Sequence, residues 1–364
     1  MKTSPKVNLL LFFFFSLFSS SITAFPHFFP NVSSIPPSFL RNITTSPWNS
    51  FNNLSGCHSG QKVPGISKLK NYFHYFGYIG NTTTNFTDDF DDALESAVKN
   101  YQLNFNLNVT GELDESTVKQ ILKPRCGVAD IVNGSSTMNT GKAASMTGHT
   151  VAHYSFFPGR PRWPSWKQNL TYAFDPRNQL SDDVKRVFAN AFSRWSEWTP
   201  LTFNESSNYF TADLRIGFYA GDHGDGEEFD GVLGTLAHAF APPRGLLHLD
   251  SDETWIINDA LASGSATAMD LESVAVHEIG HLLGLGHSSV EDAIMFPTIS
   301  SGLRKVELAR DDVEGIQELY GTNPDNNGTT GPSFGEREMS GGHRESSVLV
   351  QFLFLAVGLA FFVL

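Results

Sequence analysis

The sequence predicts an α+β protein with a small helical unit followed by a larger unit that mixes strands and helices. Between residues 65 and 130, apolar residues recur three or four positions apart in three stretches, which is the spacing of amphipathic helices. After residue 154, β-branched and aromatic runs alternate with further helical patterns. With 364 residues the chain exceeds one ordinary domain, so we expect two folded units with processed ends.

The N-terminus, residues 1–24, has the layout of a cleaved secretory signal. Lys2 and Lys6 precede the apolar run NLLLFFFFSLF, and small residues follow it up to Ala24. The alternative is a buried hydrophobic segment. Secretion agrees with the acceptor triplets for N-glycans, which begin at Asn31, Asn42, Asn53, Asn81, Asn85, Asn108, Asn133, Asn169, Asn204 and Asn327.

The C-terminal residues 343–364 resemble a signal for glycosylphosphatidylinositol (GPI) attachment that is removed on maturation. They end in the uncharged run VLVQFLFLAVGLAFFVL, with no cationic residue behind it. A spanning helix normally has basic residues on its cytosolic side, whereas a GPI signal has small residues, a polar spacer and an apolar tail. Ser340 is the expected attachment residue, and a transmembrane anchor is the alternative.

The first folded unit is expected to span residues 65–130. Residues 25–64 lack periodicity and predict an irregular N-terminal pro-segment. Three helices are predicted from ISKLKNYFHYFGYI, DDALESAVKNYQLNF and DESTVKQILK, with Asp114 as an N-cap. Residues 131–153 are rich in Gly, Ser and Thr and too polar for a core, so they predict an activation linker and a domain boundary.

The second unit is expected to span residues 154–324, before a flexible stalk at 325–342. NLTYAF, LTFNE and ADLRIGFYA are predicted strands, and DDVKRVFANAFSRWSEW is a predicted amphipathic helix between them. LESVAVHEIGHLLGL and DDVEGIQELYG predict two more helices. The net charge of −13 argues against nucleic acid as a partner, because phosphates are held mainly by cationic side chains.

The stretch HEIGHLLGLGH, from His277 to His287, has the spacing of a metal site. Because the preceding residues have helical periodicity, His277 and His281 lie one turn apart on one face, where two imidazoles can bind one ion. Glu278 lies one step further around the helix, within reach of a water at that ion. Gly284 is expected to end the helix with a positive φ, so that the chain turns and presents His287 as a third ligand.

Three nitrogen ligands and an open fourth position are typical of catalytic zinc. Glu278 would take a proton from the attacking water and pass it to the leaving nitrogen of an amide, so the site predicts peptide hydrolysis. The alternative is a pair of surface histidines on a helix. The extended spacing to His287, followed by Met295 as an apolar floor under the metal, favours the zinc site.

Cys126 lies alone in PRCGVAD, upstream of the zinc motif. A thiolate is a better zinc ligand than water, so a cysteine delivered from the preceding domain would fill the open position and block the enzyme. Arg125 and Asp130 flank it and are expected to pair and hold the loop. The alternatives are a buried structural cysteine or a disulfide with Cys57, for which we otherwise expect a structural role.

Two further clusters of possible metal ligands are expected to stabilise the fold. One holds nitrogen and oxygen donors that suit a closed four-ligand zinc site: His223, Asp225, His238 and His248. The other combines carboxylates with backbone carbonyls that suit calcium: Asp230, Asp250, Glu253, Gly231, Leu233 and Thr235. From spacing alone, a set of solvated loop charges is an equal alternative. Metals would replace the disulfides that a chain with two cysteines lacks.

These motifs resemble those of the matrix metalloproteinases, or matrixins, of the metzincin clan. Over about Gly65 to Pro324, PRCGVAD resembles the family's cysteine switch, HEIGHLLGLGH its catalytic zinc helix and AIMFP its Met-turn. GDHGDGEEFDGVLGTLAHAF and HLDSDETW resemble its structural zinc and calcium loops. The resemblance implies a matrixin catalytic domain, with a twisted mixed five-stranded sheet and three helices, preceded by a small three-helix peptidoglycan-binding-like prodomain.

The resemblance assigns the same residues to the same ions, Zn²⁺ at both histidine sites and Ca²⁺ at the carboxylates, with Glu278 as the base. It is strongest to the short plant-type members that carry a GPI anchor and lack a haemopexin domain. We therefore expect a monomeric, secreted metalloendopeptidase zymogen on the outer face of the plasma membrane, acting on proteins or peptides. In the family a freed N-terminus near Tyr154 pairs with an acidic residue of the last helix, here Asp311 or Asp312. The alternative from another class is a catalytically idle cell-surface adhesion protein.

Overall fold

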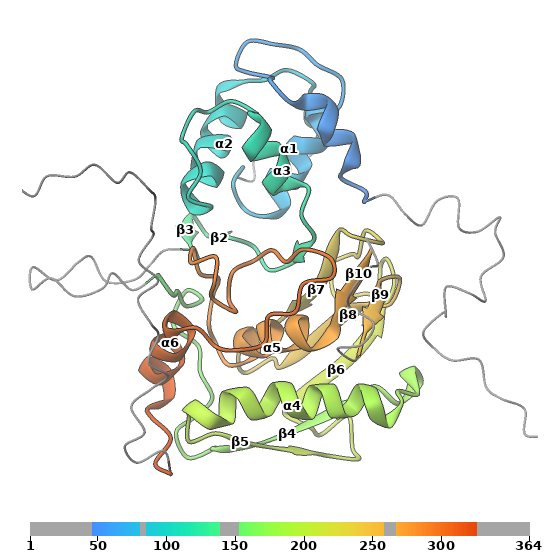
Figure 1. Cartoon of the computed structure of the whole chain (residues 1–364), viewed down its shortest axis with the longest axis vertical. Coiled ribbons are helices and arrows are strands. Elements are labelled where there is room, and N and C mark those ends of the chain that lie inside the picture. The colour runs from blue at the N-terminus through green and yellow to red at the C-terminus, as the bar shows by residue number, and fades with distance from the viewer. Residues whose placement is uncertain (1–45, 81–84, 139–152, 258–266, 326–364) are drawn as a thin grey trace, which may run out of the picture. The chain divides into compact units, whose positions relative to one another are not determined.

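The computed structural model describes residues 46–80, 85–138, 153–257 and 267–325 (Figure 1). The predicted signal and GPI segments lie outside these residues, as do five predicted modification sites: Asn31, Asn42, Asn81, Asn327 and Ser340. The other six glycan acceptors are all exposed: Asn53, Asn85, Asn108, Asn133, Asn169 and Asn204. Within the described ranges, no helix has both the length and the apolar character needed to cross a bilayer.

The three predicted helices of the first unit are present as α1 (Ile66–Tyr75), α2 (Asp92–Asn104) and α3 (Glu115–Ile121). Their apolar faces pack together around buried aromatic rings such as Phe73 and Tyr101. Asp91 caps α2 by accepting from Leu94 N at 3.0 Å, and Asp114 caps α3 by accepting from Thr117 N at 2.8 Å. The helical spacing and the predicted N-cap at Asp114 are thus confirmed.

The pro-segment is more ordered than its composition predicts. Asn49–Leu54 forms a 3₁₀ helix, and Trp48, Phe51 and Leu54 are buried in the core of the helical unit. The Trp48 ring lies edge-on to Tyr72 with 5.1 Å between centroids, a favourable aromatic geometry. A single short turn has no periodicity to detect, so residues 46–56 were wrongly expected to be irregular.

The second unit is built on a mixed sheet in the order β1-β7-β8-β6-β4-β5. Five strands come from the unit itself: β4 (Asn169–Phe174), β5 (Thr202–Glu205), β6 (Leu214–Tyr219), β7 (Thr235–Ala239) and β8 (Leu246–Asp250). The sixth, β1 (Arg125–Cys126), belongs to the segment that carries Cys126 and pairs in parallel with β7. The sheet therefore differs from the expected five strands because the preceding unit adds an edge strand to it.

Three helices complete this unit: α4 (Asp182–Trp198), α5 (Leu271–Leu282) and α6 (Arg310–Tyr320). Figure 1 shows α4 and α5 running together along the sheet, and the buried Trp195 of α4 donates to the Val276 carbonyl of α5 at 3.0 Å. The short parallel pair β9 (Thr254–Ile256) and β10 (Ala268–Asp270) leads into α5. Asp270 then caps α5 by accepting from Ser273 N at 2.8 Å.

The predicted linker begins with ordered structure. β2 (Ile131–Val132) and β3 (Ser135–Ser136) form a hairpin, and Thr137 and Met138 after it are buried. Thr137 N donates to the Asp130 carbonyl at 2.7 Å, which ties the hairpin to the Cys126 segment. Polar composition wrongly placed all of residues 131–153 outside the core, because a hairpin satisfies its polar backbone through its own pairing.

Candidate metal centre and active site

The last turn of α5 presents two of the predicted ligands. The Nε2 atoms of His277 and His281 lie 3.1 Å apart. The chain then turns at Gly284, whose φ of 105° agrees with the prediction. A Cβ at Gly284 would lie 2.1 Å from the Pro161 carbonyl oxygen, so the turn also requires a residue without a side chain. This turn brings His287 into contact with the other two imidazoles, with ring centroids 4.8 Å from His281.

Each imidazole has its Nδ1 atom beside a group that can only accept a hydrogen bond. Nδ1 of His277 lies 2.7 Å from the Ile294 carbonyl oxygen, and Nδ1 of His281 lies 2.8 Å from that of Leu285. Nδ1 of His287 lies 2.9 Å from Asp130 Oδ1. These contacts place the proton on Nδ1 and leave the Nε2 lone pairs for an ion. Burial lowers the pKa of all three histidines, which favours the neutral, metal-binding form.

Cys126 completes this cluster. Its Sγ lies 3.5 Å from His281 Nε2, and the sulfur and the three histidine ligand atoms all lie within 4.8 Å of one another. Ligands around one tetrahedral zinc are about 3.3–3.7 Å apart, given Zn–N of about 2.0–2.1 Å and Zn–S of about 2.3 Å. Nε2 of His287 is buried without a hydrogen-bond partner among the described residues, as expected for a metal ligand. The four atoms therefore fit a zinc ion.

The Cys126 segment is held from both sides. Arg125 N donates to the Gly234 carbonyl at 3.1 Å, and Cys126 N donates to that of Pro297 at 2.9 Å. The Arg125 guanidinium is fully buried and bonds Asp130 Oδ1 at 2.7 Å, the predicted pairing. Burial raises the pKa of Asp130, but Arg125 and His287 outweigh it and bring that pKa down to about 2. Asp130 thus connects the buried arginine to an imidazole of the metal site.

Glu278 is fully buried next to the cluster. Neither of its carboxylate oxygens has a hydrogen-bond partner among the described residues, and burial raises its pKa to about 8. A carboxylate with free lone pairs and a pKa near neutrality has the properties of a general base that takes up and returns a proton. Its position agrees with the predicted role, which the geometry alone does not test.

Met295 packs against α5, and its predicted place under the metal stays a prediction. A Cβ on Gly280 would meet its Sδ at 2.3 Å, so the thioether packs directly against the helix backbone between the two ligand histidines. Asp312, at the start of α6, holds this turn by accepting from Ile294 N at 2.8 Å and Met295 N at 3.0 Å. No pattern in the sequence predicted this anchoring role for Asp312.

Asp311 contacts the start of the second unit in the uncleaved chain, and its pairing with a freed N-terminus stays a prediction. Its Oδ1 accepts from His153 N and Tyr154 N, both at 2.9 Å, and its Oδ2 accepts from Ser288 Oγ at 2.7 Å. Asp312 already accepts hydrogen bonds from the backbone of the Met-turn. The start of the second unit therefore already contacts Asp311 in the uncleaved chain, in which the helical unit is still attached.

The second predicted zinc cluster also converges. Oδ2 of Asp225 lies 2.9 Å from His223 Nε2, 2.8 Å from His238 Nε2 and 2.7 Å from His248 Nδ1. His238 and His248 face each other on the antiparallel strands β7 and β8, which fixes their spacing. Burial lowers the pKa of each of these two histidines to about 4. Four donors at these separations fit a closed tetrahedral site.

Two of the three predicted calcium carboxylates, Asp250 and Glu253, are buried with an unsatisfied oxygen, whereas Asp230 is exposed. Asp250 Oδ2 and Glu253 Oε2 have no hydrogen-bond partner among the described residues. Burial raises the pKa of Asp250 to about 7 and that of Glu253 to about 8. Amides of the intervening loop donate to neighbouring oxygens, Thr235 N to Asp230 at 2.7 Å and Leu233 N to Glu253 at 2.6 Å. Buried anionic oxygens without partners point to a cation, and the roles of the Gly231, Leu233 and Thr235 carbonyls stay predictions.

A pocket opens beside Glu278 and runs along α5. Its lining residues are Cys126, Leu236, Ser273, Val274, His277, Glu278, Ile294, Phe296, Pro297, Thr298, Ile299 and Lys305.

Comparison with known proteins agrees with this geometry. Residues 162–321 match the family model described as Matrixin, and residues 62–121 match the one described as Putative peptidoglycan binding domain. Metalloendoproteinase 5-MMP of Arabidopsis thaliana is 58% identical over 92% of this chain and 91% of its own length. Metalloendoproteinase 2-MMP of the same species is 55% identical over 88% of each chain, and human Matrilysin is 38% identical over 61% of this chain and 75% of its own. The chain therefore belongs to the matrixin family, as a metalloendopeptidase of the plant matrix metalloproteinase type.

Proposed function

We propose that this metalloendopeptidase is made as a latent zymogen in which Cys126 fills the fourth zinc position until the prodomain is removed. The observation that carries the proposal is the convergence of the Cys126 sulfur and three histidine nitrogens on one point. The strand pairing of β1 with β7 supports it, because backbone hydrogen bonds hold the cysteine in the cleft independently of the metal. Cleavage within residues 139–152 would break the covalent link between the two units.

The proposed ligands of the catalytic zinc are His277, His281 and His287. When bound, zinc supplies a Lewis acid that acidifies water and polarises the scissile carbonyl. Glu278 accepts the proton from the attacking water on a carboxylate oxygen and delivers it to the leaving amine nitrogen. Its place on α5 between His277 and His281, lining the pocket beside them, supports this role.

The remaining metals are proposed as structural. His223, Asp225, His238 and His248 would hold a second zinc, and Asp230, Asp250 and Glu253 would hold calcium with backbone oxygens of Gly231, Leu233 and Thr235. The described part of the chain contains two free, buried cysteines and no disulfide. Metal ions would then link the loop of residues 221–235 to β8. They would replace the disulfide cross-links that stabilise many secreted proteins.

The test of the catalytic proposal is Glu278→Gln in the protein after prodomain cleavage. The variant should bind two zinc ions per chain, like the parent, because Glu278 is not a ligand. Its kcat for a quenched-fluorescence peptide should fall by about 10² to 10⁴, the range that general-base catalysis supplies. Parent activity should disappear on zinc chelation. Substantial peptide turnover by the zinc-loaded variant would remove Glu278 from the role of base.

We further propose that the mature enzyme is secreted, glycosylated and anchored to the outer face of the plasma membrane by GPI. The support is the sequence of the two ends and the exposure of the six described glycan acceptors. Phosphatidylinositol-specific phospholipase C should release the enzyme from intact cells. Retention on the membrane after that treatment would favour a spanning anchor instead.

A further inference from the structure

The pocket beside Glu278 follows α5 for one helical turn. Glu278 and His277 line one end, and Ser273, four residues earlier on the same helix, lines the other. Four residues of helix advance by about 6 Å, so the far end lies roughly one turn from the metal ligands. Ile294, Phe296 and Pro297 form the facing wall. Cys126 also lines the pocket, so prodomain removal would open it next to the proposed catalytic groups.

Lys305 lies at the far end of this pocket. Its backbone N donates to Ser273 Oγ at 2.7 Å, which fixes its main chain one turn away from His277. Its side chain crosses to the opposite wall, where Nζ donates to the carbonyl oxygens of Ala293 at 2.6 Å and Glu291 at 3.0 Å. Nζ is also 5.7 Å from the centroid of the Phe296 ring. The lysine thus spans the pocket from α5 to the Met-turn.

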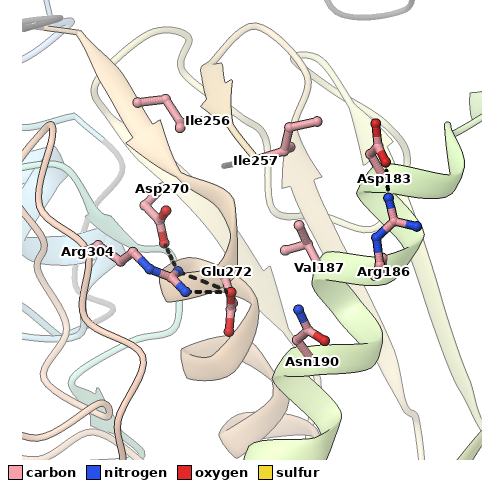
Figure 2. Close-up of a pocket in the computed structure, with 9 residues that line it drawn as sticks. All are labelled: Asp183, Arg186, Val187, Asn190, Ile256, Ile257, Asp270, Glu272 and Arg304. Atoms are coloured by element: carbon pink, nitrogen blue, oxygen red, sulfur yellow. Dashed lines mark hydrogen bonds and ion pairs between the residues drawn. The ribbon is translucent and has the colours of Figure 1, made fainter. Parts of the chain in front are cut away.

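Its neighbour Arg304 fixes the same loop on the other side. Figure 2 shows Arg304 reaching away to Glu272 and Asp270 at the start of α5, with Nη2 3.0 Å from Glu272 Oε2 and Nη1 3.7 Å from Asp270 Oδ1. Arg304 therefore attaches the loop to the start of α5. Lys305 attaches it to Ser273 of α5 through its backbone N and to the Ala293 and Glu291 carbonyls through its side chain. This double attachment holds Lys305 in place while the rest of the loop remains free of helix or strand.

The charge of Lys305 acts inside the pocket. It is the only lysine or arginine among the described residues that line it, and Glu278 is the only acidic one. Burial lowers the pKa of Lys305, and the opposing negative charges of Asp312, Asp292 and Glu291 come from residues that do not line the pocket. Two of the three ammonium protons are used by carbonyls, which leaves one donor.

We propose that Lys305 determines specificity: it closes the pocket that receives the substrate side chain after the scissile bond, and its ammonium excludes cationic side chains from that pocket. The inference rests on the proposed roles of Glu278 and the catalytic zinc, which place the scissile bond at the mouth of the pocket. Apolar side chains would pack on Val274, Ile294 and the Lys305 stem. Side chains with an acceptor at the tip, such as glutamine or glutamate, would gain the remaining donor, whereas lysine or arginine would meet a like charge in a site of low dielectric.

The test uses the full-length chain activated by cleavage within residues 139–152. The substrates are four quenched-fluorescence peptides that differ only in the residue after the cut, which is leucine, glutamine, glutamate or lysine. In Lys305→Met, the ratio of kcat/KM for the lysine peptide to that for the leucine peptide should rise by about tenfold or more. The glutamate-to-leucine ratio should fall. Lys305→Glu should raise the lysine-to-leucine ratio further, and Lys305→Arg should leave it near the parent value.

Lys185→Met is the matched control, because this lysine lies on α4, pairs with Glu205 and does not line the pocket. It should leave all four ratios unchanged. Zinc content and the leucine-peptide rate report whether each Lys305 variant is folded, and the ratios are independent of the amount of active enzyme. Unchanged ratios in both Lys305→Met and Lys305→Glu would overturn the assignment. Failure of the parent to cut any peptide would instead contradict the proposed function together with this inference.

Discussion

At the scale of single residues, the proposed latency depends on one sulfur atom in a buried position. Burial raises the pKa of the Cys126 thiol well above its usual range, so the protein interior alone favours the neutral thiol. A zinc ion reverses that preference, because a coordinated thiol is deprotonated. The sulfur is then a zinc ligand. It is a thiolate only because the metal stabilises its negative charge. The Arg125–Asp130 ion pair and the β1–β7 strand pairing hold the sulfur in position, but they do not provide the positive charge of the metal.

This arrangement predicts the behaviour of Cys126→Ser. A serine hydroxyl is a much weaker zinc ligand than a thiolate, so water and substrate should compete successfully for the fourth position. The uncleaved precursor should hydrolyse a quenched peptide at a rate within about tenfold of the processed enzyme. Cys57→Ser is the control, because Cys57 is buried in the helical unit and should leave the precursor latent. Continued latency of Cys126→Ser would mean that the prodomain inhibits by a route other than metal ligation.

At the scale of elements, α5 is the central scaffold of the active site. It presents two ligands and the base on one face and packs against α4 through Trp195 and against the Met-turn through Met295. Gly280 is the point where these contacts meet. A Cβ there would lie 2.3 Å from Met295 Sδ and 3.0 Å from a Trp195 ring carbon. Distances that short force the neighbours to move.

Gly280→Ala is therefore expected to destabilise the protein, although alanine is the better helix former. The overpacking penalty of about 1–3 kcal/mol should exceed the gain of about 1 kcal/mol in helix propensity. The measurement is the free energy of unfolding in denaturant with zinc present. Ser193→Ala, on the exposed side of α4, is the control and should change stability by less than about 0.5 kcal/mol. A stabilised Gly280→Ala variant would contradict the close packing described here.

Local sequence predicted elements with strong periodicity and missed those that depend on tertiary context. The predicted helix DDVKRVFANAFSRWSEW coincides with α4, and NLTYAF coincides with β4. β7 and β8 were not predicted, since each is short and carries a buried histidine that interrupts its apolar run. β1 is a strand only because β7 lies beside it. The metal ligands were found because their spacing is local, whereas Lys305 required knowledge of how a loop without regular structure packs on α5.

At the scale of the whole molecule, the two units share one sheet and a second set of contacts. Gln120 Nε2 donates to Thr298 Oγ1 at 3.0 Å, and Asn106 Nδ2 donates to the Ser289 carbonyl at 2.7 Å. Both acceptors lie on segments that follow the zinc motif. The prodomain therefore contacts the cleft at the metal, at β7 and beyond the third histidine. Cutting the chain would not remove these contacts, so dissociation of the prodomain would be a separate step of the proposed activation.

Calcium is expected to stabilise the molecule in a pH-dependent way. Asp250 and Glu253 have pKa values raised by burial to about 7 and about 8, against about 4 in an unfolded chain. Without calcium the folded state holds protons that the unfolded state releases, so the free energy of unfolding should fall as pH rises from about 4 to about 8. Calcium replaces those protons and should bind more tightly as pH rises.

Thermal unfolding at pH 6 and pH 8, in zinc-containing buffer with and without calcium, measures this effect. Calcium at a hundredfold excess over its Kd should add about 3 kcal/mol. The gain in Tm should be larger at pH 8. The double variant Asp250→Asn, Glu253→Gln should lose both the calcium response and this pH dependence. Equal Tm values for the parent with and without calcium at both pH values would exclude a calcium site at these carboxylates.

The most direct measurement for the account as a whole is zinc K-edge X-ray absorption of the uncleaved precursor loaded with two zinc ions. The account predicts one sulfur neighbour at about 2.3 Å per two zinc ions, with nitrogen or oxygen neighbours at about 2.0–2.1 Å. That sulfur signal should persist in Cys57→Ser and disappear both in Cys126→Ser and after prodomain removal. A zinc-loaded, latent precursor without any sulfur neighbour would contradict the central claim that Cys126 closes the catalytic metal site.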